Sequence, residues 1–199
     1  TGLGREARYA LMVADSDGFN PQTLVRPREP LLSPAWSPDG KRIAYVSFQK
    51  GSSAVYIVEL ATGAGATEPV SNAKGINGAP AFSPDGSKLA LTLSKSGNPE
   101  IYVMDIASRS LRQVTTHYGI DTEAVWMPDG QTLLFTSDRG GKPQIYQVSA
   151  AGGEAKRVTF TGEYNARATV SYYGRKIATV QGTGSVYRIS LLYRCFVGN

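Results

Sequence analysis

The chain repeats one order of apolar and polar positions four times. In each copy a short apolar run enters a turn of the Ser-Pro-Asp-Gly type, and a second apolar run follows at once; the fourth copy is degraded. The turn glycines are Gly40, Gly86, Gly130 and Gly174, at spacings of 46, 44 and 44 residues. A fixed period of this length is typical of architectures built from stacked repeats.

Each repeat predicts the same small sheet. Pro presets φ for a tight turn, Asp bonds to nearby backbone and Gly accepts positive φ, so the two runs form a hairpin. A third apolar run follows at 55–58, 101–104, 145–148 and 186–189, and short final strands follow at 112–115 and 156–159. Four antiparallel strands per repeat predict an all-β fold, a β-propeller.

The second strands are apolar at neighbouring positions. Ile43 to Val46, Leu89 to Leu91, and Leu133 to Phe135 place apolar side chains on both faces of the strand. A sheet with one wet face would alternate apolar and polar residues. We therefore expect each sheet to be covered on both sides, as in radially packed blades.

The strand count predicts one incomplete domain. No strand near the C-terminus completes the half-blade that opens the chain, so the sequence reads as a fragment of a longer propeller. We expect an incomplete β-propeller over residues 1–190 and an atypical tail at 191–199. The blades are predicted at about 1–25 (partial), 31–70, 77–115, 121–159 and 165–190.

Composition and charge exclude several classes of function. The formal net charge is +5, but Lys and Arg are scattered among the turns. Nucleic-acid binding would require a basic stripe with stacking aromatic residues. No apolar run is long enough to span a membrane. We therefore expect neither a nucleic-acid partner nor a membrane span.

Catalytic motifs are absent from the sequence. His117 is the single histidine, and there is no HExxH and no Gly-x-Ser-x-Gly. The segment Asp15-x-Asp17-Gly18 resembles the start of a calcium loop but lacks the Glu that would complete one. We predict a protein that is not an enzyme and that has no cofactor and no metal site.

The candidate binding face is the mouth of the central channel. The Pro-Asp-Gly turns are stereotyped, whereas the loops at the opposite end vary, and rigid scaffolds place binding residues on such loops. The first strand of each blade is innermost, so residues at its start ring the mouth. They are Ile76, Asn77, Ala79, Asp121, Thr122, Glu123, Asn165 and Arg167.

Segments 31–40, 77–86, 101–105 and 135–141 resemble the propeller of the TolB family, a periplasmic component of the Tol-Pal cell-envelope system. The resemblance covers about residues 9–189. It implies a six-bladed propeller that binds the peptidoglycan-associated lipoprotein, Pal, and supports outer-membrane integrity and cell division. It also implies colicin import in some bacteria. TolA would bind only through an N-terminal domain that this sequence does not contain.

The resemblance also implies which residues bind Pal. Family positions implicated in this contact fall on Ile76, Ala79 and Thr122, and Ile76 stands where a histidine often occurs. Together with the neighbouring mouth positions, the predicted Pal-binding set is Ile76, Asn77, Ala79, Thr122, Glu123, Asn165 and Arg167.

Two other classes of function stay open at this point. One alternative is the gating propeller of a prolyl-oligopeptidase-like serine peptidase, which uses similar Pro-Asp-Gly blades. The other is a propeller that binds a small ligand or calcium, with Asp121 or Glu123 taking the ion.

Overall fold

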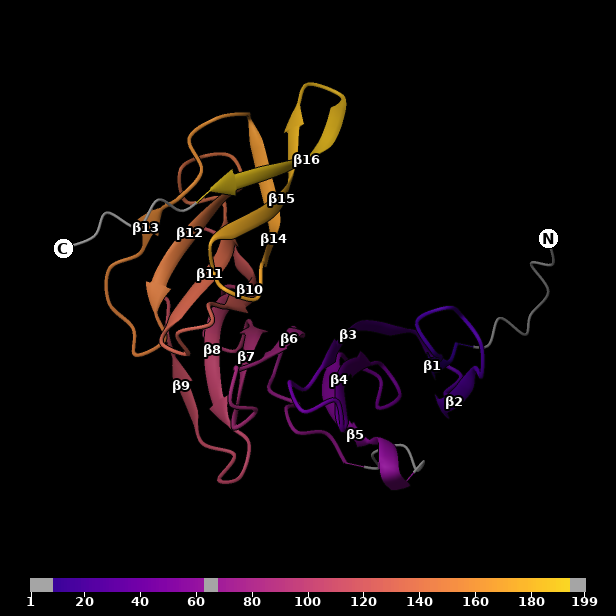
Figure 1. Cartoon of the computed structure of the whole chain (residues 1–199). Coiled ribbons are helices and arrows are strands. Elements are labelled where there is room, and N and C mark those ends of the chain that lie inside the picture. The colour runs from indigo at the N-terminus through magenta and orange to yellow at the C-terminus, as the bar shows by residue number, and fades with distance from the viewer. Residues whose placement is uncertain (1–8, 63–67, 194–199) are drawn as a thin grey trace.

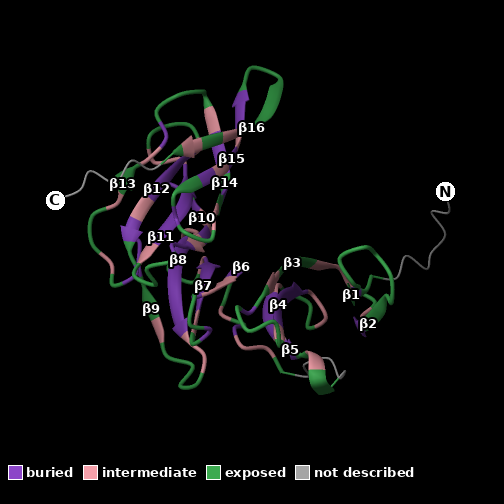
Figure 2. Ribbon diagram, in the orientation of Figure 1, coloured by how far each residue is buried: buried purple, intermediate pink, exposed green. Residues whose placement is uncertain are grey.

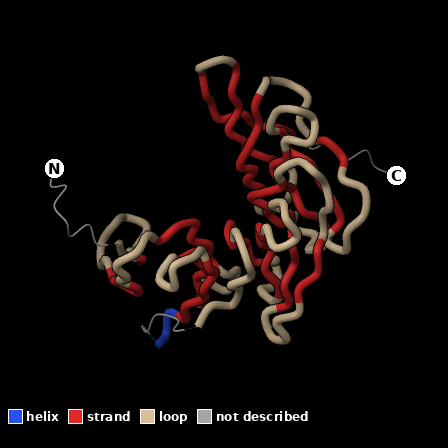
Figure 3. The backbone as a smooth tube through the Cα atoms, turned by 180° about the vertical axis from the view of Figure 1, so that it is seen from behind, coloured by secondary structure: helices blue, strands red, loops and turns tan. Residues whose placement is uncertain are grey.

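The computed structural model describes residues 9–62 and 68–193. Parts of the predicted first blade (1–8), second blade (63–67) and tail (194–199) lie outside the described residues. Five antiparallel sheets follow one another in chain order along a curved row (Figure 1). The one helical segment among the described residues is the short turn η1 (Leu60–Thr62) (Figure 3).

The strands of each sheet are adjacent in sequence, so every connection within a sheet is a hairpin. The sheets contain β1 (Leu11–Val13) and β2 (Gln22–Val25); β3 (Leu31–Trp36), β4 (Arg42–Ser47) and β5 (Ala54–Glu59); β6 (Asn77–Phe82), β7 (Lys88–Leu93), β8 (Glu100–Asp105) and β9 (Leu111–Gln113); β10 (Asp121–Trp126), β11 (Thr132–Ser137), β12 (Gln144–Ser149) and β13 (Lys156–Arg157); and β14 (Tyr164–Val170), β15 (Lys176–Thr183) and β16 (Val186–Tyr193).

Two sheets have all four predicted strands, which confirms the expected propeller of four-stranded antiparallel blades. The other three sheets described have fewer strands. Among the described residues after β5, an isolated bridge between Val55 and Ser71 stands where the fourth strand of this sheet is predicted. In the last sheet β16 continues to Tyr193, so the strand runs past the boundary expected at residue 190. Its pairing with β15 extends to Lys176, which explains the longer strand.

The core lies between the sheets rather than inside any one of them. Both faces of β4, β7 and β11 are buried, as the sequence predicts. One cluster joins Val46 and Val55 to Leu91 of the next sheet, and another joins Ile101 to Phe135. Figure 2 shows this buried band along the second and third strands. Hydrophobic burial therefore holds neighbouring blades together.

The Pro-Asp-Gly turns are closed by local hydrogen bonds. In the β6–β7 turn the Gly86 amide donates to the Ser83 carbonyl at 2.8 Å, and Gly86 has a φ of 71°. The Asp85 carboxylate accepts the Ser83 hydroxyl at 2.5 Å and the Ser87 amide at 3.1 Å. These bonds, with the Ser83 bond the largest cause, lower the pKa of Asp85 from 3.8 to about 2.

Replacing Asp85 with alanine is expected to lower the free energy of unfolding by about 1 kcal/mol at neutral pH, because the turn loses these hydrogen bonds at a site where solvent weakens them. A depressed pKa means that this stabilisation is present above pH 3.8 and is lost as the pH falls towards about 2. Urea unfolding across that range measures the difference. Glu68→Ala, which removes an exposed ion pair with Lys50, is the control and leaves the midpoint unchanged. An Asp85→Ala deficit that persists at the acid end would contradict the assignment.

Candidate functional site

The innermost strands β6, β10 and β14 pack beside one another, and all of the predicted mouth residues except Ile76 lie on them. Gly78 of β6 pairs with Thr92 of β7, and the Thr92 hydroxyl lies 3.3 Å from the Thr122 hydroxyl of β10. Ala79 and Thr122 are thereby placed at the same end of neighbouring blades. Ile76 directly precedes β6 at that end, and half of its surface is exposed.

A β-bulge interrupts each innermost strand at the same position. Ser33, Ala79, Glu123 and Arg167 have φ values of 50°, 45°, 54° and 54°, and all four lie within the register shifts of their sheets. Positive φ is uncommon for residues other than glycine. Such strained positions concentrate at functional sites, where surrounding contacts hold them in place. The mouth therefore repeats one pre-set backbone feature in successive blades.

Interblade hydrogen bonds hold two of these bulges. The Glu123 amide donates to the Thr92 hydroxyl at 3.3 Å, and the Arg167 amide donates to the Thr136 hydroxyl at 3.2 Å. Both threonines belong to the second strand of the preceding blade. The Arg167 guanidinium also pairs with the Glu123 carboxylate at 3.0 Å across the blades. Both side chains of this pair are accessible, the arginine more than the glutamate.

Asn77 and Asn165, two of the predicted contact residues, are buried. The Asn77 amide group donates to the Ala73 carbonyl at 2.7 Å and accepts the Ala73 amide at 2.9 Å. The Asn165 amide group donates to the Thr161 carbonyl at 2.8 Å. Each asparagine therefore fixes the loop that leads into its strand, and the accessible part of the set consists of the other five residues.

Ile120 is a further exposed residue of this face that the sequence reasoning missed. The Ile120 amide donates to Asp138 at 2.7 Å, just as the Ile76 amide donates to Ser94 at 2.7 Å. Both isoleucines are about half exposed. The 44-residue repeat period would have identified Ile120 as the counterpart of Ile76, because each precedes the first strand of its blade.

Asp121 and Glu123, the carboxylates proposed for an ion, have cationic partners. Arg139 donates to Asp121 at 2.6 Å, with side-chain exposures of 15% and 0%, and Arg167 pairs with Glu123. No cluster of three or more potential metal ligands occurs within residues 9–62 and 68–193. His117 is part of a loop, where its Nδ1 accepts the Gly119 amide at 2.9 Å. In the same ranges no helix is long and apolar enough to cross a membrane.

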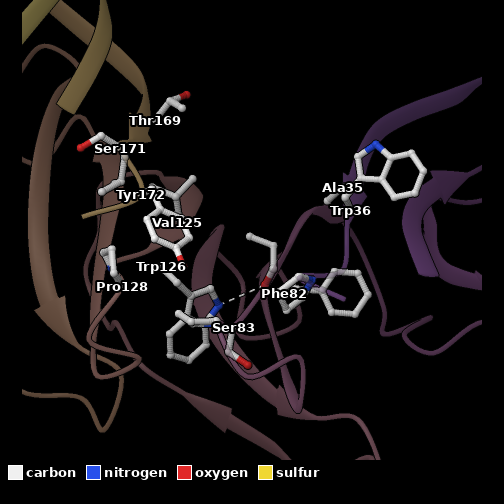
Figure 4. A pocket seen from close by; sticks show the side chains of 14 residues that line it. Ala35, Trp36, Phe82, Ser83, Val125, Trp126, Pro128, Thr169, Ser171 and Tyr172 are labelled. Atoms are coloured by element: carbon white, nitrogen blue, oxygen red, sulfur yellow. Dashed lines mark hydrogen bonds between the residues drawn. The ribbon is translucent and has the colours of Figure 1, made fainter. Parts of the chain in front are cut away.

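A groove of about 660 Å³ opens at the opposite end of the innermost strands (Figure 4). It is lined by the aromatic residues and prolines that lead into the turns of successive blades, among them Trp36, Phe82, Trp126 and Tyr172. The Trp126 indole donates to the Ala81 carbonyl at 3.0 Å and is buried. Trp36, its counterpart, is 53% exposed. The two tryptophans thus occupy the same point of their repeats, but only Trp126 belongs to the core.

Comparison with known proteins places this geometry in a family. The model of the TolB beta propeller domain (PD40) matches residues 2–193. The Tol-Pal system protein TolB of Xanthomonas oryzae pv. oryzae (strain PXO99A) is 64% identical over 194 residues, which cover 98% of this chain and 44% of that protein. The chain thus spans less than half of the length of such relatives.

Comparison with solved structures supports the same family. The crystal structure of TolB from Acinetobacter baumannii has a TM-score of 0.86 and 49% identity, and the match covers 93% of this chain and 46% of that one. A prolyl endopeptidase structure has a TM-score of 0.64 at 13% identity, with 92% of this chain and 31% of that one covered. That second likeness shows the shared fold alone, so the gating-propeller alternative is not favoured. The sequence match, the propeller fold and the repeated blades together show that the chain belongs to the TolB β-propeller family.

Proposed function

We propose that this propeller binds the peptidoglycan-associated lipoprotein Pal at the channel mouth, without chemistry, as part of the Tol-Pal system. The supporting observation is the repeated bulge at Ala79, Glu123 and Arg167, which holds accessible side chains in fixed positions at one end of neighbouring blades. Because this face is already rigid, docking of a folded partner costs little backbone conformational entropy.

The exposed residues suggest how the face would hold its partner. Ile76 and Ile120 supply apolar contact area, Thr122 supplies a hydroxyl, and Glu123 with Arg167 supplies a charged pair. Small side chains at Ala79 and Thr122 leave room for a partner side chain to enter the mouth. Binding energy in such interfaces concentrates in a few central residues.

The wider role follows from the relatives and belongs to the same proposal. The matching relatives carry the name Tol-Pal system protein TolB. A place in the periplasm, support of outer-membrane integrity and cell division, and use of this face by colicins are properties we propose for the full protein. Binding to TolA would require a region outside this chain.

Titration calorimetry of the chain with the soluble domain of Pal tests the proposal. We expect saturable binding at one site, with one propeller per lipoprotein domain. An Asp39→Ala variant, altered in a turn on the opposite face, is the control and binds equally well. Absence of heat with a properly folded chain, as judged by circular dichroism, would contradict the proposal.

A further inference from the structure

Two acidic side chains lie together in the interior beneath the mouth. Glu100 begins β8 of one blade, Asp121 begins β10 of the next, and both residues are at most 2% exposed. The Asp121 carboxyl group lies close enough to Glu100 to raise the pKa of the Glu100 carboxyl group. The Asp121 amide also donates to the carbonyl of Pro99, next to Glu100, at 3.0 Å. The pair therefore sits at the joint between two blades, directly beside Thr122.

If both groups were ionised, one buried carboxylate oxygen of the pair would lack a hydrogen-bond donor. Asp121 Oδ2 accepts Arg139 at 2.6 Å, but Asp121 Oδ1 is buried and has no donor among the described residues. Glu100 accepts the His117 amide and the Thr115 hydroxyl, each at 2.6 Å. A carboxylate can only accept, whereas a protonated carboxyl group also donates. One proton between the two groups would give the unpaired oxygen its donor.

The next blade has the neutral version of the same joint. Gln144 corresponds to Glu100 and Asn165 corresponds to Asp121, 44 residues further along the chain. The Asn165 amide group donates to Gln144 Oε1 at 3.0 Å, and the Thr159 hydroxyl donates to that oxygen at 2.7 Å, as Thr115 does to Glu100. The fold therefore builds a hydrogen bond at this place, there with Asn165 as the donor, and in the acidic pair a shared proton would supply the corresponding bond.

We propose that Glu100 and Asp121 share one proton at neutral pH, and that the pair acts as a pH-sensitive joint between two blades beneath the binding face. The proton resides on Glu100, and the Glu100 hydroxyl donates a hydrogen bond to the Asp121 carboxylate. Arg139 balances the negative charge of Asp121. Like charges this close cannot both ionise in a buried site without a large cost. Ionisation of Glu100 would push β8 and β10 apart next to Thr122.

The surrounding charges support this placement of the proton. Burial raises the pKa of Glu100 above its ordinary 4.5, and the Asp121 charge raises it further, against the lowering effect of the His117 and Thr115 hydrogen bonds. Arg139 faces Asp121. The His117 imidazole is bonded to Gly119 of its own loop, and Asp138 accepts the Ile120 amide. Arg139 is thus the cation that contacts the pair, and it contacts Asp121 rather than Glu100.

Infrared spectroscopy tests the shared proton when the spectrum of the wild-type chain is compared with the spectra of its variants. At about pH 7 we expect a carbonyl band of a protonated carboxylic acid, which is lost in Glu100→Gln and weakened in Asp121→Asn, because removal of the neighbouring charge lets Glu100 ionise. Glu123→Gln, which alters an accessible carboxylate of the same face, is the control and retains the band. A wild-type spectrum without this band would overturn the proposal.

Stability provides a second readout. Since the pKa of Glu100 is raised, the stabilisation from the proton is complete below pH 4.5 and is lost as the pH rises through the raised pKa. Glu100→Gln should therefore match the wild type near pH 4 and show a higher urea midpoint near pH 9. A difference between the two proteins that does not change with pH would equally overturn the proposal. Both readouts are independent of lipoprotein binding.

Discussion

Replacing Arg139 with methionine is expected to lower the free energy of unfolding by about 3 kcal/mol, because it leaves the Asp121 carboxylate buried without a countercharge. Arg139 donates to Asp121 at 2.6 Å, and its guanidinium also lies 5.2 Å and 5.0 Å from the ring centres of Phe135 and Tyr146. Methionine keeps most of the packing against these rings, and the destabilisation combines the missing countercharge with the lost Arg139 Nε donation to the Ser137 hydroxyl at 3.0 Å. Urea unfolding at neutral pH measures it.

The second arginine pair provides the matched control. Arg167 and Glu123 form an ion pair at 3.0 Å, but the arginine side chain is 75% exposed. Arg167→Met should therefore change stability by less than about 1 kcal/mol. Combining Arg139→Met with Asp121→Asn should recover much of the loss, because asparagine already occupies the corresponding position at Asn165. Equal losses for the two arginines would contradict the role assigned to burial.

Replacing Thr122 with arginine is expected to weaken Pal binding by at least about 30-fold, that is about 2 kcal/mol, if the channel mouth is the docking site. The Thr122 hydroxyl lies 3.3 Å from Thr92, at the boundary between two blades. A long cationic side chain there would fill the mouth and remove the space for a partner. Ala79→Arg should have the same effect on the neighbouring strand. Titration calorimetry measures both affinities.

Two variants separate occlusion from other causes. Ala79→Gly removes a methyl group at a residue whose φ is 45°, a conformation that glycine adopts readily, and should keep the affinity. Tyr172→Arg adds the same charge at the opposite end, where the tyrosine is 87% exposed, and should also keep it. Wild-type affinity in Thr122→Arg and Ala79→Arg would place the docking site elsewhere.

Local features of the sequence were sufficient to predict the blades. Ser-Pro-Asp-Gly closes a turn through bonds among residues five or fewer positions apart, as at Ser83 and Asp85. The apolar runs at 43–46, 89–91 and 133–135 indicate which strands are covered on both faces, because leaving runs of apolar side chains in water on either face is unfavourable. These interactions need no knowledge of which blade lies next to which. The mouth could be predicted for the same reason, since the innermost strand follows from strand order.

The role of each mouth residue could not be predicted in this way. Asn77 and Arg167 belong to the same predicted set, but one is buried in loop hydrogen bonds and the other is exposed. Exposure also separates Trp36 from Trp126, although the two stand at the same point of their repeats. The difference comes from the neighbouring blade, which the pattern within one repeat does not describe.

The sequence by itself determined the repeat, the hairpins and the end of the blades that carries variable loops, because each depends on residues close together in the chain. Only the tertiary structure decided that Glu100 lies beside Asp121 and that Arg139 balances the charge of Asp121. It also decided that Ala79, Glu123 and Arg167 form bulges with positive φ at the mouth. These depend on contacts between strands of different blades, and their energies arise from burial and charge across that boundary.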